Sequence, residues 1–425
     1  MTHVFQFLFW LGLIWLGYVY LGYPALLWFI GLFRSFRPNT SDTYLPKVSV
    51  LISARNEQKD IGWKIEETLA WDYPREQLEL LVASDASEDG TDEILANVSD
   101  PRLRTLRLVE RKGKNEALNC LNELAKGELL FFTDANSHIE PTSLRRMASY
   151  FADHRVGCVT GSECTIRDSE DHAATAGIRA SLGFEGIVTT LESKLGSVLV
   201  CDGSIFCIRR NLFRRLQVDL ANDLELPIHI GAEGYAILFD PFALSFEKAS
   251  PPQEEFRRKR RICAQGALGV WRLRDRIGGL RRWQFFSRKL LRWFGLFPLT
   301  LIFVSNLALV STPFYAVIFA LQVCFLALAS IGWGFAARNR EGSWLTALPY
   351  YFILVNLGAL SGVIQAMFGR RFRVWESPAH TRGVQKMPTS KVSDEKSQTS
   401  TGSQSGMLHE PITYLPKLRR EKYRP

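Results

Sequence analysis

Asp134 and Asn136 are the residues whose types and spacing first suggest chemistry. They follow residues 129–132, a continuous apolar run that predicts a strand buried on both faces. Ligands of open α/β sheets bind just beyond the carboxyl ends of the strands. Two oxygen-bearing side chains at that place can hold a divalent cation against the phosphates of a ligand. The alternative is an ordinary helix cap before Glu140 and Pro141, because Asp and Asn are favoured caps.

Three further apolar runs, at residues 47–53, 78–83 and 103–109, predict strands that alternate with helices. This alternation indicates a mostly parallel sheet. Glu57 comes soon after the first of these strands, and Asp85 directly follows the second. Because the carboxyl ends of parallel strands meet at one edge of a sheet, Glu57, Asp85 and Asp134 together predict a site.

Long apolar stretches indicate a membrane protein. The chain has 425 residues and a net charge of +9, and residues 4–33 carry no charge. That length predicts a retained anchor, kinked at Pro24. Residues 293–337 can form two further spans and residues 344–368 a third. Arginines crowd the flanks of these segments, so the basic surplus indicates membrane orientation and not nucleic-acid binding.

The sequence does not decide on which side of the membrane the C-terminal tail lies. With the large domain inside, one anchor and three later crossings place the tail outside, yet the basic residues 369–373 ("GRRFR") favour the inside. Either one segment is re-entrant or the count is one too high.

The seven cysteines form no CxxC pair and no zinc spacing. They indicate reduced structural thiols in a cytosolic domain. The polar composition of residues 388–406 predicts disorder.

Seven short motifs occur in one order: "VSVLISARNE", "ASDASEDGT", "RKGKNEALN", "FTDAN", "CDGSIFCIRRNLF", "LANDLELPIHI" and "RRKRRI". In this order they resemble the family 2 glycosyltransferases, and more narrowly the membrane-bound branch that includes cellulose, hyaluronan and chitin synthases. The resemblance covers residues 46–266. It implies a GT-A fold, which is a Rossmann-like α/β domain with a mostly parallel sheet, in the cytosol between N- and C-terminal transmembrane helices.

The resemblance also implies a nucleotide-sugar site. Arg55 and Glu57 would line the nucleoside pocket, Asp85 would contact the base of a uridine nucleotide, and Lys114 would bind the phosphates. A carboxylate can accept from the ring N–H of uracil. The structural alternatives are a helix cap for Asp85 and an ordinary turn around Lys114.

Asp134 would bind Mg²⁺ or Mn²⁺, with Asn136 where the family carries a second acid. An amide oxygen can still be a ligand, although it brings no charge. His138, two residues further on, is expected to be a surface or capping residue.

Asp223 matches the general base that takes the proton of the acceptor hydroxyl, although it also fits a helix start. Arg258 and Arg261 match the last motif and can offset the charge of the departing diphosphate. Arg258 replaces the usual Gln and Ile262 the usual Trp. Basic residues beside a membrane can alternatively face lipid or solvent.

The sequence thus predicts five segments. These are an N-terminal anchor (1–36), a GT-A domain (45–266), amphipathic interfacial helices (267–292), about three C-terminal transmembrane segments (293–370) and a basic, largely disordered tail (371–425).

The implied function is that of an inverting membrane glycosyltransferase. It would transfer a sugar from a UDP-sugar to a growing extracellular or envelope polysaccharide, with its catalytic domain on the cytoplasmic side of a bacterial-type plasma membrane. Its partners would be the donor, a saccharide or lipid-linked acceptor, membrane lipid and export or assembly subunits. One alternative is transfer of a single sugar to a polyprenyl phosphate or another lipid, and a second is a non-catalytic membrane scaffold.

Overall fold

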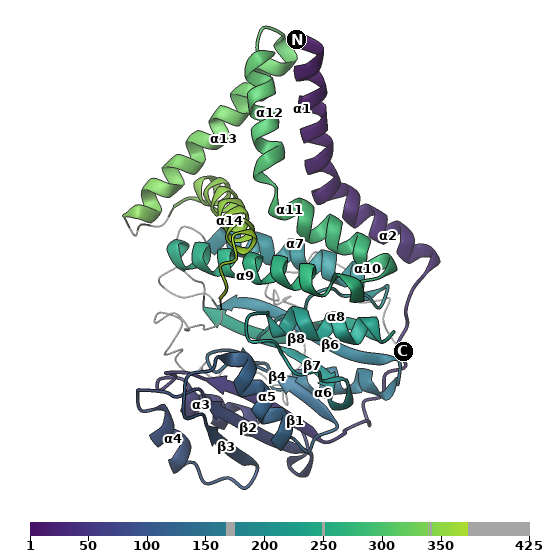
Figure 1. Cartoon of the computed structure of the whole chain (residues 1–425), viewed down its shortest axis with the longest axis vertical. Coiled ribbons are helices and arrows are strands. Elements are labelled where there is room, and N and C mark those ends of the chain that lie inside the picture. The colour runs from purple at the N-terminus through teal and green to yellow at the C-terminus, as the bar shows by residue number, and fades with distance from the viewer. Residues whose placement is uncertain (167–174, 249–250, 339, 341, 373–425) are drawn as a thin grey trace, which may run out of the picture. The chain divides into compact units, whose positions relative to one another are not determined.

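In the computed structural model, residues 1–166, 175–248, 251–338, 340 and 342–372 are described. Their strands form one mixed sheet in the order β3-β2-β1-β4-β7-β6-β8-β5 (Figure 1). Of the tail predicted at residues 371–425, residues 373–425 lie outside the described residues.

The first half of the sheet is parallel. It contains β1 (Val48–Ala54), β2 (Leu78–Ser84), β3 (Leu103–Arg107) and β4 (Leu129–Phe132), which confirms the four predicted strands. Helices α3 (Ile61–Leu69), α4 (Thr91–Asn97) and α5 (Lys114–Leu124) connect them. These strands are apolar on both faces because helices cover both sides: Phe131 packs into one core and Phe132 into the other.

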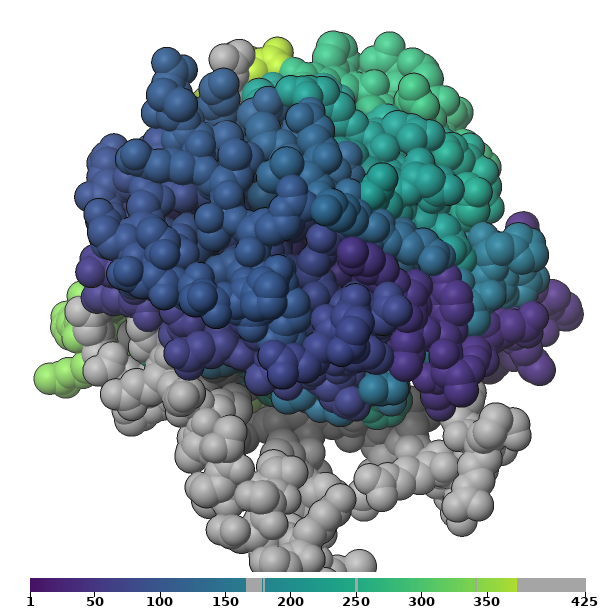
Figure 2. Space-filling model, turned by 90° about the horizontal axis from the view of Figure 1, so that it is seen from below, coloured from purple at the N-terminus to yellow at the C-terminus, as the bar shows by residue number. Residues whose placement is uncertain are grey.

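The second half of the sheet is mixed. It contains β5 (His138–Ile139), β6 (Val156–Ile166), β7 (Phe206–Arg209) and β8 (Ala236–Lys248). Strand β7 runs antiparallel to both β4 and β6, and β5 antiparallel to β8, whereas β6 and β8 are parallel. The mostly parallel sheet expected from the sequence is therefore found in full only in the first half. Figure 2 shows the lower face of Figure 1, where purple and blue N-terminal residues form most of the surface.

His138 is buried, which corrects the prediction of a surface position. Its ring stacks on Trp63 at a centroid distance of 4.0 Å, and its Nδ1 is 3.1 Å from Glu67 Oε1. These contacts explain the burial, since a buried imidazole needs a hydrogen-bond partner.

Helices α6 (Ser143–Ser149), α7 (Thr175–Ser193) and α8 (Asn222–Ala232) pack on the second half of the sheet. Helix α9 (Pro252–Arg272) continues through residue 266, so the boundary predicted there falls within one helix. A bent run follows, made of α10 (Gly279–Gln284), a π-helical segment (Phe285–Leu290) and α11 (Leu291–Trp293).

The apolar helices agree with the predicted spans. The N-terminal one consists of α1 (Thr2–Gly17), a π-helical segment (Tyr18–Gly22) and α2 (Tyr23–Phe33), with Pro24 in the first turn of α2. The C-terminal ones are α12 (Leu296–Ala308), α13 (Pro313–Ala337) and α14 (Trp344–Met367). Among the described residues, 2–33, 313–337 and 344–367 are long and apolar enough to cross a membrane. The run Gly279–Trp293 together with Leu296–Ala308 is bent by 56° and is either a broken span, which would be a fourth crossing, or a re-entrant loop.

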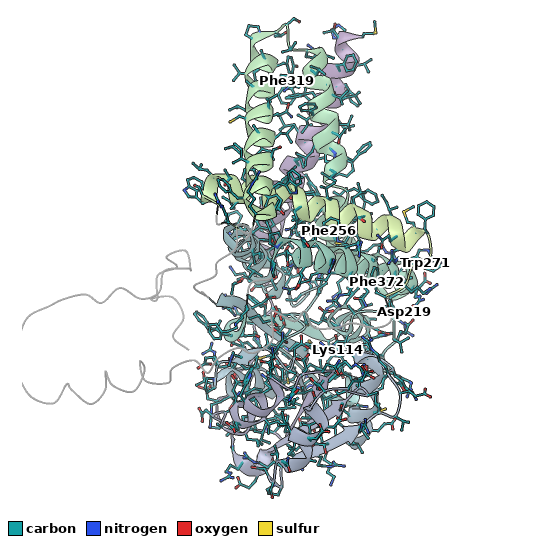
Figure 3. All side chains as sticks on the ribbon, turned by 90° about the vertical axis from the view of Figure 1, so that its left-hand side faces the viewer. Lys114, Asp219, Phe256, Trp271, Phe319 and Phe372 are labelled. Carbon is teal, nitrogen blue, oxygen red and sulfur yellow. The ribbon has the colours of Figure 1, made fainter. Side chains whose placement is uncertain are left out.

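Helix α14 packs along α9 through small residues (Figure 3). A Cβ atom placed on Gly358 would lie 3.3 Å from the backbone oxygen of Phe256, and one on Gly362 only 2.2 Å from that of Arg260. The two backbones can approach so closely because these positions lack side chains. The position of α9 is therefore fixed by an apolar helix that follows it in the sequence.

We expect Gly362→Ala to lower the free energy of unfolding by about 1–3 kcal/mol, because the added methyl group overlaps a backbone oxygen. Gly31→Ala in α2 is the matched control, since a Cβ there meets no atom within 4 Å. The control should be neutral or stabilising, because alanine favours helices. Thermal unfolding of the detergent-solubilised chain measures both, and equal melting temperatures would contradict this packing.

Candidate active site

A cavity of about 360 Å³ lies at the carboxyl ends of β1, β2 and β4 and is closed on another side by α8 and α9. The structure brings together in its lining every site residue predicted from the sequence. They are Arg55, Glu57, Asp85, Lys114, Asp134, Asn136, Asp223, Arg258 and Arg261.

Asp85 holds the turn that precedes α5. Its two carboxylate oxygens accept hydrogen bonds from the backbone N–H groups of Lys112, at 2.7 Å, and Gly113, at 2.9 Å. Gly113 has a φ of 91°, a conformation that favours glycine. The next residue, Lys114, begins the helix. Asp85 therefore does not cap α4, the helix that follows it, and instead positions Lys114.

The loops after β1 and β2 hold each other in a strained conformation. Asn56 and Ala86 have φ values of 54° and 52°, which L-residues rarely adopt. The Arg55 guanidinium donates to the backbone oxygen of Asp85 at 3.1 Å and to Glu88 at 2.8 Å. Glu57, which is 3% exposed, donates its backbone N–H to Thr91 Oγ1 at 2.9 Å. Strain of this kind often accompanies binding sites.

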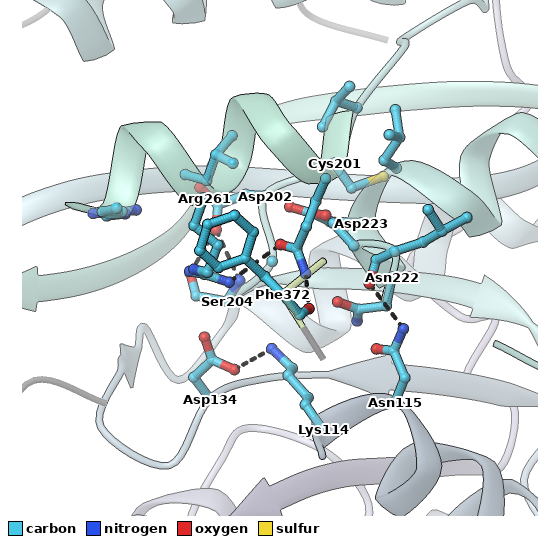
Figure 4. Close-up of a pocket in the computed structure, with 18 of the residues that line it drawn as sticks. Lys114, Asn115, Asp134, Cys201, Asp202, Ser204, Asn222, Asp223, Arg261 and Phe372 are labelled. Atoms are coloured by element: carbon cyan, nitrogen blue, oxygen red, sulfur yellow. Dashed lines mark hydrogen bonds and ion pairs between the residues drawn. The ribbon is translucent and has the colours of Figure 1, made fainter. Parts of the chain in front are cut away.

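Lys114 and Asp134 form an ion pair of 2.5 Å across the cavity floor (Figure 4). Asn136, two residues after Asp134, also lines the cavity. In the described part of the chain, no three His, Cys, Asp or Glu residues form a metal cluster. One carboxylate and one amide nevertheless fit a site for Mg²⁺, which in phosphate-binding sites is often held by one or two carboxylates together with water and phosphate.

Asp223 lies in the first turn of α8, on the side of the cavity opposite Lys114 and Asp134 (Figure 4). Burial raises the pKa of its carboxyl group, and the positive charges of Lys114, Arg261 and Lys289 oppose this shift. A carboxylate with a raised pKa is a better proton acceptor near neutral pH. The geometry thus fits the predicted base, although Asp223 also begins a helix.

A cluster of three carboxyl groups around Arg258 was not predicted from the sequence. The same cavity is lined by Glu163 on β6, by Glu247 on β8 and by Asp202, which precedes β7. Arg258 forms a 3.1 Å ion pair with Glu163. Burial, with Glu163 as the second cause, raises the pKa of Asp202 to about 7. Burial also raises the pKa of Glu247. Arg258 therefore faces acids inside the cavity and not lipid. Only Asp202, within the "CDGS" motif, carried a sequence signal.

Three aromatic residues and a lysine from segments that adjoin the apolar helices complete the lining. Phe285, Lys289 and Trp293 come from the bent run after α9, and Phe372 follows α14. The amide nitrogen of Gln265 donates to the backbone oxygen of Phe372 at 3.2 Å. In Figure 4, Phe372 lies between the Lys114–Asp134 pair and the group around Arg261. Sequence reasoning missed these residues because they belong to none of the seven motifs.

Arg261 lies on α9, three residues after Arg258. Burial, and secondarily the charge of Arg258, lowers the pKa of its guanidinium to about 10. It contacts Gln265 Oε1 at 3.4 Å. The position of Arg261 in the cavity fits a role beside a diphosphate.

Residues 49–217 match the family model described as Glycosyl transferase family 2. The chain carries a family 2 glycosyltransferase domain. The Bacillus subtilis protein named probable glycosyltransferase YdaM is 27% identical over 337 residues, which cover 72% of this chain and 79% of that protein. The β-monoglucosyldiacylglycerol synthase of Trichormus variabilis is 25% identical over 254 residues, which cover 56% of this chain and 54% of that protein. Neither is named as a cellulose, hyaluronan or chitin synthase, so that branch stays a prediction.

The GT-A fold of this glycosyltransferase domain is supported by a solved structure. The Pyrobaculum calidifontis mannosyltransferase PcManGT, in complex with GDP-Man and Mn²⁺, superposes with a TM-score of 0.63. The superposition covers 85% of this chain and 99% of that one, at 21% identity. This likeness shows the fold, and the family match together with the related glycosyltransferases supports transferase activity.

Loss of the Arg258 charge should destabilise this family 2 domain more at pH 8 than at pH 5.5. Asp202 has a folded-state pKa above its unfolded value, so its ionisation costs stability as the pH rises from about 4, its usual value, to about 7. Arg258→Gln removes the cation that lies near the ionised Asp202 and Glu163 carboxylates. The difference in melting temperature from wild type should therefore be larger at pH 8.

Arg257→Gln, on the exposed side of the same helix, is the control and should show no such pH dependence. A pH-independent effect of Arg258→Gln would contradict the pairing.

Proposed function

We propose that the protein is an inverting glycosyltransferase that moves one sugar from a nucleotide sugar to an acceptor held at the membrane, and that the acceptor is a lipid. One observation carries this proposal. The cavity extends from the polar strand ends to an aromatic wall, Phe285 and Trp293, built by the run that leads into the apolar helices. A hydrophobic acceptor can therefore reach the reaction centre from the membrane.

The donor is proposed to bind at the strand ends. Asp85 and Glu57 lie there for a uracil base, with Arg55 beside them, and Lys114 lies at the start of α5, where phosphates are favoured. Asp134 and Asn136 would hold Mg²⁺ or Mn²⁺, which would screen the charge of the leaving diphosphate. The related mannosyltransferase structure contains GDP-Man and Mn²⁺, which supports a nucleotide sugar and a divalent metal.

The reaction is proposed to be a single displacement. Asp223 accepts the proton of an acceptor hydroxyl, whose oxygen bonds to the anomeric carbon as the bond from that carbon to the diphosphate oxygen breaks. Arg258 and Arg261 offset the negative charge on the departing diphosphate. One displacement inverts the anomeric configuration, and no Ser or Cys nucleophile is required.

A lipid acceptor is preferred over the polysaccharide suggested by the motif order. The wall of Phe285 and Trp293 favours it, as does the related protein named β-monoglucosyldiacylglycerol synthase. The polysaccharide alternative rests on the resemblance alone. In either case the arginine pattern supports a cytoplasmic position for the catalytic domain.

Release of UDP should require a divalent metal. Purified protein in detergent is incubated with a panel of nucleotide sugars and with lipid or oligosaccharide acceptors, and free nucleotide and glycosylated product are measured. EDTA should abolish turnover, and Mn²⁺ or Mg²⁺ should restore it. Full activity in EDTA would overturn the metal assignment, and product from oligosaccharides alone would overturn the lipid acceptor.

Asn136 provides a control for the metal site. Asn136→Ala should raise the metal concentration needed for half-maximal activity, whereas Asn136→Asp should be tolerated, because it adds a charged ligand. An unchanged metal requirement in Asn136→Ala would show that Asn136 is not a ligand.

Substitutions of Asp223 and Asp85 should separate catalysis from donor binding. Asp223→Asn keeps the shape but cannot take a proton, so transfer should fall by about a hundredfold to ten-thousandfold. UDP affinity, measured by calorimetry, should change less than about tenfold. Asp85→Ala should weaken UDP binding directly, because it removes the base contact and frees the turn that positions Lys114.

Asp275→Asn, at an exposed aspartate, is the matched control and should change neither quantity. Normal transfer in Asp223→Asn together with normal UDP affinity in Asp85→Ala would overturn both assignments.

A further inference from the structure

Lys289 is a cation of the cavity that the proposed mechanism does not use. It lines the cavity from the π-helical segment Phe285–Leu290. Short π-helical turns within helices are frequent at functional sites. Phe285, Lys289 and Trp293 are spaced four residues apart, and all three line the cavity. The lysine therefore lies between two aromatic side chains on one stripe of the bent run.

The acidic residues next to Lys289 are bound by other cations. Arg288 pairs with Glu192 and, at 2.5 Å, with Glu185, both on α7. Arg292 also pairs with Glu185. The two glutamates thus neutralise the arginines on either side of the lysine.

Within the described residues, no side chain forms a hydrogen bond or an ion pair with the ammonium group of Lys289. Other cations of the cavity have such partners: Lys114 pairs with Asp134, and Arg258 with Glu163. The charges of Glu185, Glu192 and Asp223 act on Lys289 without a direct contact. A partly buried charge without a directly bound partner is unfavourable beside apolar helices. An anionic group on a ligand would relieve this cost.

The position of Lys289 distinguishes two possible anions. The diphosphate of the donor is assigned to Lys114 and the metal of Asp134 at the strand ends, and to the two arginines of α9. Lys289 instead lies with Phe285 and Trp293, where apolar chains of an acceptor would pack. Its anion therefore belongs on the acceptor, next to the hydrophobic part of the molecule.

We infer that Lys289 binds a phosphate that joins the hydroxyl-bearing head group of the acceptor to its lipid chain. This inference rests on the proposed lipid acceptor and names its chemical class. Asp223 requires a hydroxyl on the acceptor, and Lys289 requires an anion, so a neutral lipid satisfies only the first. A phosphodiester or diphosphate-linked lipid with a hydroxylated head group satisfies both.

Binding of two matched short-chain lipids tests this inference without turnover. The probes are dioctanoyl phosphatidylglycerol, which carries a phosphate and hydroxyls, and dioctanoylglycerol, which carries a hydroxyl and no phosphate. Calorimetry on the full chain in detergent should show that wild type binds the phospholipid at least about tenfold more tightly. Lys289→Gln should lose that preference, and Lys289→Arg should keep it.

Lys194→Gln is the control, because Lys194 is exposed at the end of α7. It should keep the wild-type preference. Melting temperatures of all variants show whether the fold is retained, and Lys289→Arg keeps the inference testable if Lys289→Gln unfolds.

Three outcomes would overturn the inference: equal binding of both lipids by wild type, an unchanged preference in Lys289→Gln, or a Lys289→Gln variant that loses UDP affinity instead. The proposed function fails differently. If Lys289-dependent phospholipid binding is found but no lipid is glycosylated in the turnover assay, the anion site stands and the proposed acceptor is wrong.

Discussion

Charge compensation inside one cavity is the constraint on which the site depends. The chain gathers acids and bases where the sheet meets α8 and α9, and each charge held away from water needs a partner. The backbone amides of a turn compensate Asp85, Lys114 compensates Asp134, and Arg258 compensates Glu163. These contacts also fix positions, because each pair joins elements far apart in the sequence. The interactions that offset the cost of burying these charges therefore also set the geometry of the cavity.

Helix α9 transmits this geometry between the sheet and the apolar helices. One of its sides carries Arg258 and Arg261 into the cavity, and another packs against Gly358 and Gly362 of α14. At Gly266, a Cβ would lie 2.9 Å from the ring of Trp293. The helix packs closely against its neighbours on several sides, so the position of the cationic wall of the cavity depends on the packing of the apolar helices around it.

The sequence predicted those features that depend on neighbouring residues. The strands β1, β2, β3 and β4 were found because they are short runs of apolar residues, and the nine site residues because they lie in motifs at strand and helix ends. The antiparallel half was not predicted, because β6 mixes polar and apolar residues, including Thr160 and Glu163. Lys289 and Phe372 were missed because their place in the cavity depends on how distant helices bend and return, which no local pattern encodes.

The return of the chain to the cavity after α14 closes a loop through one side chain. Arg371 binds Asp219, which also binds Arg272 at the end of α9. The segment between these two arginines therefore begins and ends at one aspartate. A single carboxylate thus joins the end of α9 to the residues that follow α14, and it closes a loop that contains the apolar helices α12, α13 and α14.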